Sequence, residues 1–279
     1  MAANAYLDGV HRHLGSLIDT GTIELPAIPR IAGQIVASFA DSHADTAALA
    51  DLIGEDPALS ARMLRVVNSP SFRGATEIDD LRQASARMGL DRVRAISLAA
   101  SVTGALLKTS VYSDPVEDAL HRGICSGLWA KELARAVRAN PEMAYLCGLL
   151  HNVGDVVVLN AVAELSAEEL PERDLQELVD ALGPAAGRRL GQHWDLPSPV
   201  VLSIGYDDEV STAGADANAL AVILCGAFIA DSMLSGVMIA TEIARTPAAE
   251  HLGLDADGVG RVIAEEDEVR LSLEALAID

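Results

Sequence analysis

Apolar residues recur along most of the chain at the three- and four-residue spacing of an α-helix, and the strict alternation typical of β-strands is nearly absent. Segment 56–68 shows this most clearly. Asp56 can cap its first turn, and Pro57 suits the first helical position because a missing N–H costs nothing there. One apolar face is expected from Leu59, Met63, Val66 and Val67. The pattern predicts an all-α protein built from many helices.

The same spacing predicts further helices up to residue 151, interrupted by a turn-like stretch at 110–115. They are expected at 79–89, 91–107, 116–139 and 141–151. Asn140, Pro141 and Glu142 combine a capping side chain, a first-position proline and an acidic residue beside the positive helix end, so they mark a helix start. The sequence before 151 therefore indicates stacked helices of moderate length.

The later part of the chain carries two features that affect packing. Gly183, Gly187 and Gly191 repeat at every fourth position, so they share one helix face and let a neighbouring helix approach closely. Segment 219–240 is apolar and long enough to span a bilayer, but Asp231 inside it and its acidic flanks favour a buried core helix. Segment 212–216 is expected to be a hinge before the final helices.

Charge and composition narrow the classes of partner. Forty-one acidic residues against 20 Lys and Arg leave a net charge of −21, which repels phosphate backbones and anionic membrane surfaces. Aromatic residues make up only 3% of the chain, too few for a base-stacking surface. We therefore expect no nucleic-acid partner and no membrane partner.

The cysteines and the N-terminus indicate a compartment. Cys125, Cys147 and Cys225 are odd in number and lack CxxC spacing, so they support neither a disulfide framework nor a zinc site. Segment 1–8 has neither the basic region nor the apolar run of a secretory signal. The sequence therefore predicts a protein of the reducing cytoplasm.

Three histidines, His121, His151 and His193, are candidates for chemistry because histidine near acidic residues can bind a metal. The alternative for each is a single polar side chain near a helix end, satisfied by a neighbour or by solvent. His151 is the best placed, since it follows an apolar stretch and precedes Asn152 and Gly154. This context predicts an imidazole at the inner end of a buried helix.

Six motifs in order resemble the HDOD family, a divergent branch of the HD metal-dependent phosphohydrolases. They are LPAIP at 25–29, IGEDPALSARMLRVVNSPSF at 53–72, MGLDRVRAISL at 88–98, the His151 motif at 145–159, GRRLGQHWDLP at 187–197 and SIGYDDE at 203–209. The resemblance covers about residues 15–210 and implies the helical HD-domain-like fold. It also implies an HDOD domain at 1–213, with an N-terminal helical part at 1–110 and an HD-like part at 111–213, followed by a C-terminal helical extension at 214–279.

The resemblance implies a dismantled metal site. Catalytic HD enzymes bind metal through a first histidine, an adjacent His-Asp pair and a late Asp or His. In this chain Arg122 occupies the first position, and the pair is His151-Asn152, so a neutral amide replaces the bridging carboxylate. An amide oxygen holds a hard dication poorly, and Arg122 would add positive charge beside it. We therefore predict no catalytic residues, no metal and no cofactor.

Acidic residues leave one alternative open. Asp207 and Asp208 stand where HDOD proteins commonly show two histidines, and Asp155 stands where many relatives have lysine. Because aspartates bind Mg²⁺ or Mn²⁺, a rearranged metal site of His151 with Asp207 and Asp208, joined by Asp155, is the alternative. It would make the protein a metal-dependent phosphohydrolase or phosphodiesterase with altered ligands.

Other motif residues have a packing and a binding interpretation. His193 and Trp194 belong to the predicted vestigial pocket, where Trp194 either stacks on a ring-shaped ligand or, as we favour, fills a gap between helices. Leu25 and Ile28 are expected to pin the N-terminal segment to the core. Asn68 is expected to end its helix, with a partner-binding loop as the alternative.

The sequence thus predicts a non-catalytic regulatory protein of bacterial signal transduction. It is expected to act through contact with a protein partner, with or without a small ligand sensed in the vestigial pocket. A nucleotide is disfavoured as that ligand by the acidic residues, unless Arg122 or a bridging cation compensates. The sequence identifies neither the partner nor the oligomeric state.

Overall fold

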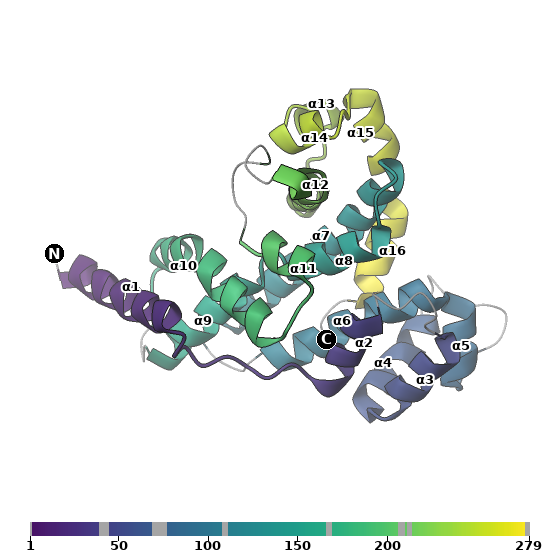
Figure 1. Cartoon of the computed structure of the whole chain (residues 1–279), viewed down its shortest axis with the longest axis horizontal. Coiled ribbons are helices and arrows are strands. Elements are labelled where there is room, and N and C mark those ends of the chain that lie inside the picture. Colours follow the sequence, from purple (N-terminus) through teal and green to yellow (C-terminus); the bar gives the residue numbers. More distant parts are fainter. Residues whose placement is uncertain are drawn as a thin grey trace.

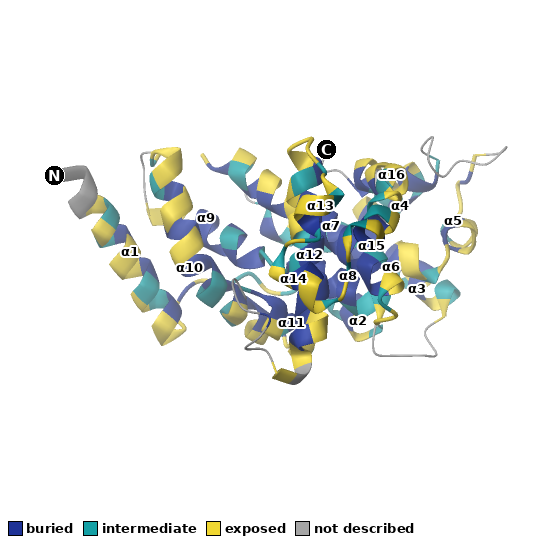
Figure 2. Ribbon diagram, turned by 90° about the horizontal axis from the view of Figure 1, so that it is seen from above, coloured by how far each residue is buried: buried dark blue, intermediate teal, exposed yellow. Residues whose placement is uncertain are grey.

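A computed structural model describes residues 2–38, 45–68, 77–107, 111–165, 169–205, 210 and 214–276. Every regular element in these ranges is a helix, so the predicted all-α class is confirmed for the described part of the chain. Figure 1 shows the helices in an elongated arrangement, with α1 at one end and α2–α5 at the other. Figure 2 shows that the buried residues lie where the helices face one another.

The N-terminal helices follow the caps that the sequence supplies. They are α1 (Ala2–Thr20), α2 (Arg30–Ser38), α3 (Thr46–Gly54), α4 (Pro57–Val67), α5 (Leu81–Met88) and α6 (Leu90–Leu106). The Asp56 side chain accepts hydrogen bonds from the backbone N–H groups of Ala58 and Leu59, as predicted for the start of α4. The predicted apolar face of α4 is buried. Local capping therefore determines this helix.

Three predicted helix boundaries differ from the structure. The helix predicted at 79–89 is α5, which begins at Leu81 with Asp80 as its cap, because the Asp80 side chain accepts a hydrogen bond from the Gln83 N–H. α6 begins at Leu90 directly after Gly89, whose φ of +81° lets one residue end α5 and start the next helix. The turn-like interpretation of 110–115 is wrong from Ser113 onward, where the next helix has already begun.

Asn68 ends α4 as expected. Its side chain donates hydrogen bonds to the carbonyl oxygens of Leu64 and Ile78 and accepts one from the Ile78 N–H at 2.9 Å. These bonds fix the chain on both sides of the connection to α5. Ser69 and Pro70 lie outside the described residues.

The central helices are α7 (Ser113–Ala136), α8 (Pro141–Leu150), α9 (Val153–Leu165), α10 (Glu172–His193) and α11 (Ser198–Ser203). α7 ends before the predicted residue 139. The Asn140 side chain caps α8, and Pro141 is its first residue, as predicted. α7 packs on α8 and α9 packs on α10. The central part is therefore made of two closely packed helix pairs.

Glycines allow these pairs to approach closely. A Cβ on Gly154 would lie 1.9 Å from the carbonyl oxygen of Gly183, and one on Gly187 would lie 2.4 Å from a methyl carbon of Ile204. Gly191 also faces Ile204 at 3.1 Å. The predicted packing role of the glycine face on α10 is thus confirmed.

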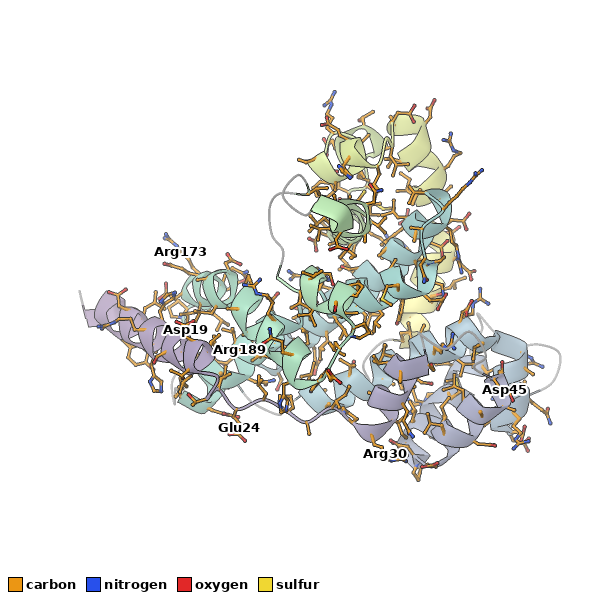
Figure 3. All side chains as sticks on the ribbon, in the orientation of Figure 1. Asp19, Glu24, Arg30, Asp45, Arg173 and Arg189 are labelled. Carbon is orange, nitrogen blue, oxygen red and sulfur yellow. The ribbon has the colours of Figure 1, made fainter. Side chains whose placement is uncertain are left out.

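The N-terminal segment is fastened to α10. Trp194, 5% exposed, donates a 2.8 Å hydrogen bond from Nε1 to the carbonyl oxygen of Pro26. Arg189 donates from its guanidinium to the carbonyl oxygens of Ile18 and Asp19 at the end of α1. Figure 3 labels Arg189 and Asp19. Leu25 and Ile28 pack on the core. The packing interpretation of Trp194 and of segment 25–29 agrees with these contacts.

The C-terminal elements are η2 (Gly214–Asp216), α12 (Ala217–Leu234), α13 (Ala240–Ile243), α14 (Pro247–His251), α15 (Ala256–Ile263) and α16 (Glu266–Leu276). α12 packs on α7, where a Cβ on Gly226 would lie 2.8 Å from the Ala130 nitrogen. It ends at Leu234 rather than at the predicted 240, and Gly236 follows with a φ of +78°. Residues 212 and 213 of the predicted hinge at 212–216 lie outside the described residues, and its remaining part forms η2.

Two apolar stretches in the described ranges have the length and hydropathy of a membrane span. They are Pro141–Leu165, which comprises α8 and α9, and Ala217–Leu234. Their most apolar windows are 72% and 50% buried inside the structure, respectively. Buried core helices of soluble proteins have the same properties, so these stretches are weak evidence for a membrane.

Candidate functional site

The predicted pocket lies where α8 ends and α9 begins, facing α7. His151 is the C-terminal cap of α8, and Asn152 forms the turn before α9. The backbone carbonyl of His151 accepts a 3.2 Å hydrogen bond from the N–H of Gly205, which follows α11. Gly205, from the motif at 203–209, thereby helps to position the turn that carries His151 and Asn152.

His151 is held as a neutral imidazole. Its Nδ1 lies 2.8 Å from the carbonyl oxygen of Gly148, so Nδ1 carries the proton and donates it. Burial lowers the pKa of His151 below 6.5, while the Gly148 bond and Asp231 oppose this shift. Arg122 lowers the pKa slightly further. The Nε2 atom is therefore left with a lone pair, the form of histidine that accepts a hydrogen bond or binds a metal.

Asn152 connects helices instead of presenting an oxygen to the pocket. Its Nδ2 donates a 2.8 Å hydrogen bond to the carbonyl oxygen of Ala119 on α7. Its Oδ1 lies 2.9 Å from the point that a Cβ on Gly123 would occupy, so the absence of a side chain there makes room for the amide. A carboxylate could not donate to Ala119. The amide is thus suited to a structural role at this position.

Asp231 lies near Arg122 and His151, and the site prediction missed it. Its Oδ1 lies 3.7 Å from Nε of Arg122, and both side chains are largely exposed, so this ion pair adds little stability. The sequence signal was a lone charged residue inside an otherwise apolar helix. Because Arg122 is paired with this carboxylate, its positive charge at the first-histidine position is partly neutralised.

Asp155 stands in the first turn of α9 and is partly buried. Burial raises its pKa to about 7, Arg122 opposes the rise, and Asp180 adds to it. Its Oδ1 lies 2.7 Å from the Cβ position of Gly183 on α10, so the carboxyl group is packed between α9 and α10. A large fraction of Asp155 is therefore protonated near neutral pH.

The remaining predicted site residues are placed differently. His193 is exposed at the last position of α10, and Trp194 turns toward Pro26. Asp207 and Asp208 lie outside the described residues. The structure thus brings Arg122, His151, Asn152 and Asp155 to one region of the fold and gives Trp194 a separate packing role.

The described part of the pocket does not fit an HD-type metal site. No group of three or more His, Cys, Asp or Glu side chains within the described ranges is close enough to hold a metal ion. Arg122, which the motif resemblance assigns to the first-ligand position, pairs with Asp231, and the Asn152 amide donates a hydrogen bond to α7. A cation would meet a guanidinium there, where catalytic relatives supply a ligand.

Comparison with known proteins places the chain in a family. The model of the HDOD domain matches residues 25–210, about two thirds of the sequence and nearly the range that the motifs indicated. The chain belongs to the HDOD family. A relative from Treponema pallidum, an uncharacterized protein, is 28% identical over 194 residues, which is 66% of this chain but only 37% of the relative. The match therefore spans well under half of that protein.

Solved structures share the fold of this HDOD protein. An HDOD domain protein of unknown function from Geobacter sulfurreducens has a TM-score of 0.73 at 21% identity and covers 96% of this chain and 97% of its own. A Shewanella amazonensis protein, provisionally named a phosphohydrolase, has a TM-score of 0.68 at 22% identity, covering 95% and 98%. A Marinobacter aquaeolei protein, provisionally named a signal transduction protein, has a TM-score of 0.65 at 20% identity, covering 98% and 66%. These likenesses confirm the predicted helical HDOD fold.

Proposed function

We propose that this HDOD protein is a non-catalytic regulator in a bacterial signalling pathway, acting in the cytoplasm through contact with a protein partner. The observation that carries the proposal is the hydrogen bond from Asn152 to Ala119. The motif resemblance assigns Asn152 to the position of the bridging carboxylate, and here its amide joins two helices instead. The same resemblance assigns Arg122 to the position of the first histidine. The HDOD domain at 1–213, with parts at 1–110 and 111–213, and the extension at 214–279 remain part of the proposal.

Hydrolysis would require a ligand set that lowers the pKa of a bound water. His151 offers one neutral nitrogen, but the nearby Arg122 disfavours a dication, and the Asn152 amide carries no charge to offset it. The same groups suit recognition of a small ligand better. The neutral Nε2 of His151 offers a hydrogen-bond acceptor, and the guanidinium of Arg122 offers donors.

The alternative is a metal-dependent phosphohydrolase with altered ligands. It is favoured by the neutral imidazole of His151, since this is the protonation state that binds metals. It predicts stoichiometric metal in the purified protein. The regulatory proposal predicts none, so elemental analysis after equilibration with Mn²⁺, Fe²⁺ or Mg²⁺ distinguishes the two.

Activity assays test the proposal directly. Wild-type protein and the His151→Ala variant are incubated with Mn²⁺ and either bis-p-nitrophenyl phosphate or cyclic dinucleotides. We expect no turnover above the buffer blank from either protein. Turnover by the wild type that is lost in His151→Ala would overturn the proposal in favour of the hydrolase. His193→Ala is the matched control, because His193 is exposed on a different helix end.

Ligand sensing is tested by thermal shift against nucleotides. A ligand at a hundredfold its Kd adds about 2.7 kcal/mol of apparent stability. If the site binds such a ligand, the shift should disappear in Arg122→Gln and persist in Arg173→Gln, because Arg173 is an exposed residue in the first turn of α10. An unchanged shift in Arg122→Gln would place the ligand elsewhere.

A further inference from the structure

The C-terminal helix α16 lies against helices that are far away in the sequence. Figure 1 shows it in yellow, running from the C-terminal helices past α7 toward α6. It contacts both α7 and α6. It follows the matched HDOD range, which ends at residue 210. Its apolar side chains Val269, Leu273 and Leu276 recur at helical spacing and are buried.

Two polar contacts attach α16 to the N-terminal helices. Glu268 forms an ion pair with Arg92 on α6, with both side chains about half exposed. Near the other end, Arg62 on α4 donates a 2.6 Å hydrogen bond to the carbonyl oxygen of Leu276. α16 is thus an acidic amphipathic helix. Its acidic first turn contacts α6, and its apolar face lies in a groove between α6 and α7.

The groove beneath α16 carries charges of both signs, and one of its basic residues pairs with α16. Arg92, Lys131 and Arg135 line it together with Asp91 and Glu132, next to the first turn of α6. The positive end of the helix dipole favours carboxylates there; Asp91 supplies one from α6 itself, and Glu268 supplies another from α16. Nζ of Lys131 lies 3.0 Å from Oε1 of Glu142, and Arg135 forms an ion pair with Glu132. Of these three basic residues, Arg92 is therefore the one that forms an ion pair with α16.

α16 leaves part of the groove unfilled. A cavity of about 350 Å³ remains between α16 and helices α5, α6 and α7. Its apolar walls include Ile96 and Leu128 opposite Val269 and Leu276. The cavity is partly open to solvent, so α16 covers these apolar walls incompletely. A helix with larger apolar side chains would fill the groove more completely.

We infer that the groove between α6 and α7 is a docking site for an acidic amphipathic helix of a partner protein, and that α16 is its internal competitor. The inference rests on the proposed function only in assuming that output passes through protein contact. It makes no use of the pocket at His151. A tethered helix competes at an effective concentration in the millimolar range, so the intact chain would bind its partner weakly until α16 is displaced.

A peptide-binding experiment tests the inference on the full chain. The probe is a fluorescently labelled synthetic peptide with the sequence of residues 264–279. Glu268→Arg places two arginines together and loosens α16, whereas Glu274→Arg makes the same charge change at an exposed position of the same helix. By fluorescence polarisation we expect Glu268→Arg to bind the peptide at least tenfold more tightly than either the wild type or Glu274→Arg.

Two further comparisons test the charge and the cavity. Within the Leu273→Ser chain, where Glu268 keeps its charge and α16 stays loosened, adding Arg92→Glu should abolish binding of the native peptide and restore binding of a peptide carrying Glu268→Arg. A peptide carrying Val269→Phe should bind the Glu268→Arg chain more tightly than the native peptide, because the larger side chain enters the cavity. Leu273→Ser is a second way to loosen α16 if Glu268→Arg alters the circular dichroism spectrum.

Defined results would overturn the inference. One is the absence of peptide binding to both loosened variants while their helical content and melting remain normal. Another is a wild-type dimer that Arg92→Glu dissociates, which would make a second copy of this chain the occupant. Phosphodiesterase activity in the same preparations would instead contradict the proposed function and leave the groove unaffected, so the two failures are distinguishable.

Discussion

The side-chain amide of Asn152 donates a 2.8 Å hydrogen bond to the carbonyl oxygen of Ala119, which joins the turn after α8 to α7. The motif resemblance assigns Asn152 to the position of the metal-bridging carboxylate of HD enzymes. The hydrogen bond is possible because Gly123, one turn along α7, has no Cβ to occupy the space that the amide takes. The replacement therefore removes a ligand and adds a contact between helices.

Asn152→Asp should lower stability at neutral pH. A carboxylate cannot donate to Ala119, and its oxygen would face a carbonyl oxygen, so we expect a loss of about 1–3 kcal/mol in the free energy of unfolding, measured with urea. Asn140→Asp is the control, because Asn140 only accepts hydrogen bonds, from Glu142 and Met143, and Asp caps a helix equally well. Equal losses in both variants would contradict the role assigned to Asn152.

Asp155→Asn should change how stability depends on pH. The pKa of Asp155 is raised from 3.8 to about 7 in the folded protein, so between these values the folded state holds a proton that the unfolded state has released. The contribution of Asp155 to the free energy of unfolding is fully present below pH 3.8. It is lost as the pH rises from 3.8 through about 7, at up to about 1.4 kcal/mol per pH unit. Urea unfolding from pH 4 to 8 should show a flatter profile for Asp155→Asn. Parallel profiles would indicate that Asp155 is solvated.

His151→Gln should reduce the loss of stability that the wild type shows when the pH is lowered. The pKa of His151 is lowered below 6.5 by burial, so the unfolded chain takes up a proton before the folded one does. Stability is therefore lost as pH falls below 6.5 toward the folded pKa. We expect the His151→Gln variant to lose less stability than the wild type between pH 7 and 5. A larger loss would indicate that the imidazole is charged in the fold.

Gly154→Ala should be among the most damaging single methyl additions. The new Cβ would lie 1.9 Å from the Gly183 carbonyl oxygen, so α9 and α10 would have to separate. We expect a cost of about 3 kcal/mol or more, measured by thermal or urea unfolding. Gly104→Ala in α6 is the control: no atom lies within 4 Å of its Cβ position, and alanine should stabilise the helix by about 0.5–1 kcal/mol. Similar costs at both positions would contradict the close packing of α9 on α10.

The helices that could be predicted are those whose ends depend on neighbouring residues. Asp56 with Pro57 and Asn140 with Pro141 start their helices as expected, since a cap acts within one turn. The start of α6 at Leu90 was misjudged because Gly89 closes one helix and opens the next. The ends of α7 and α12 were misplaced because apolar periodicity continues beyond the last hydrogen-bonded turn.

The candidate site was predictable in part. His151, Asn152 and Arg122 could be located because ordered motifs carry them, and the loss of a carboxylate is readable from residue type alone. Asp231 could not be assigned, since it approaches Arg122 only when α12 packs on α7. The raised pKa of Asp155 could not be derived either, because it depends on burial between α9 and α10.

The sequence by itself determined the helical class, the caps and the family, because these depend on short-range spacing and residue type. Tertiary structure alone decided that Asn152 donates a hydrogen bond to Ala119. It also decided that Arg62 donates one to the carbonyl oxygen of Leu276 in α16, 214 residues later. It also decided that a groove under α16 remains partly empty. Such contacts join residues that are distant in the chain, and their geometry is fixed only when all the helices pack together.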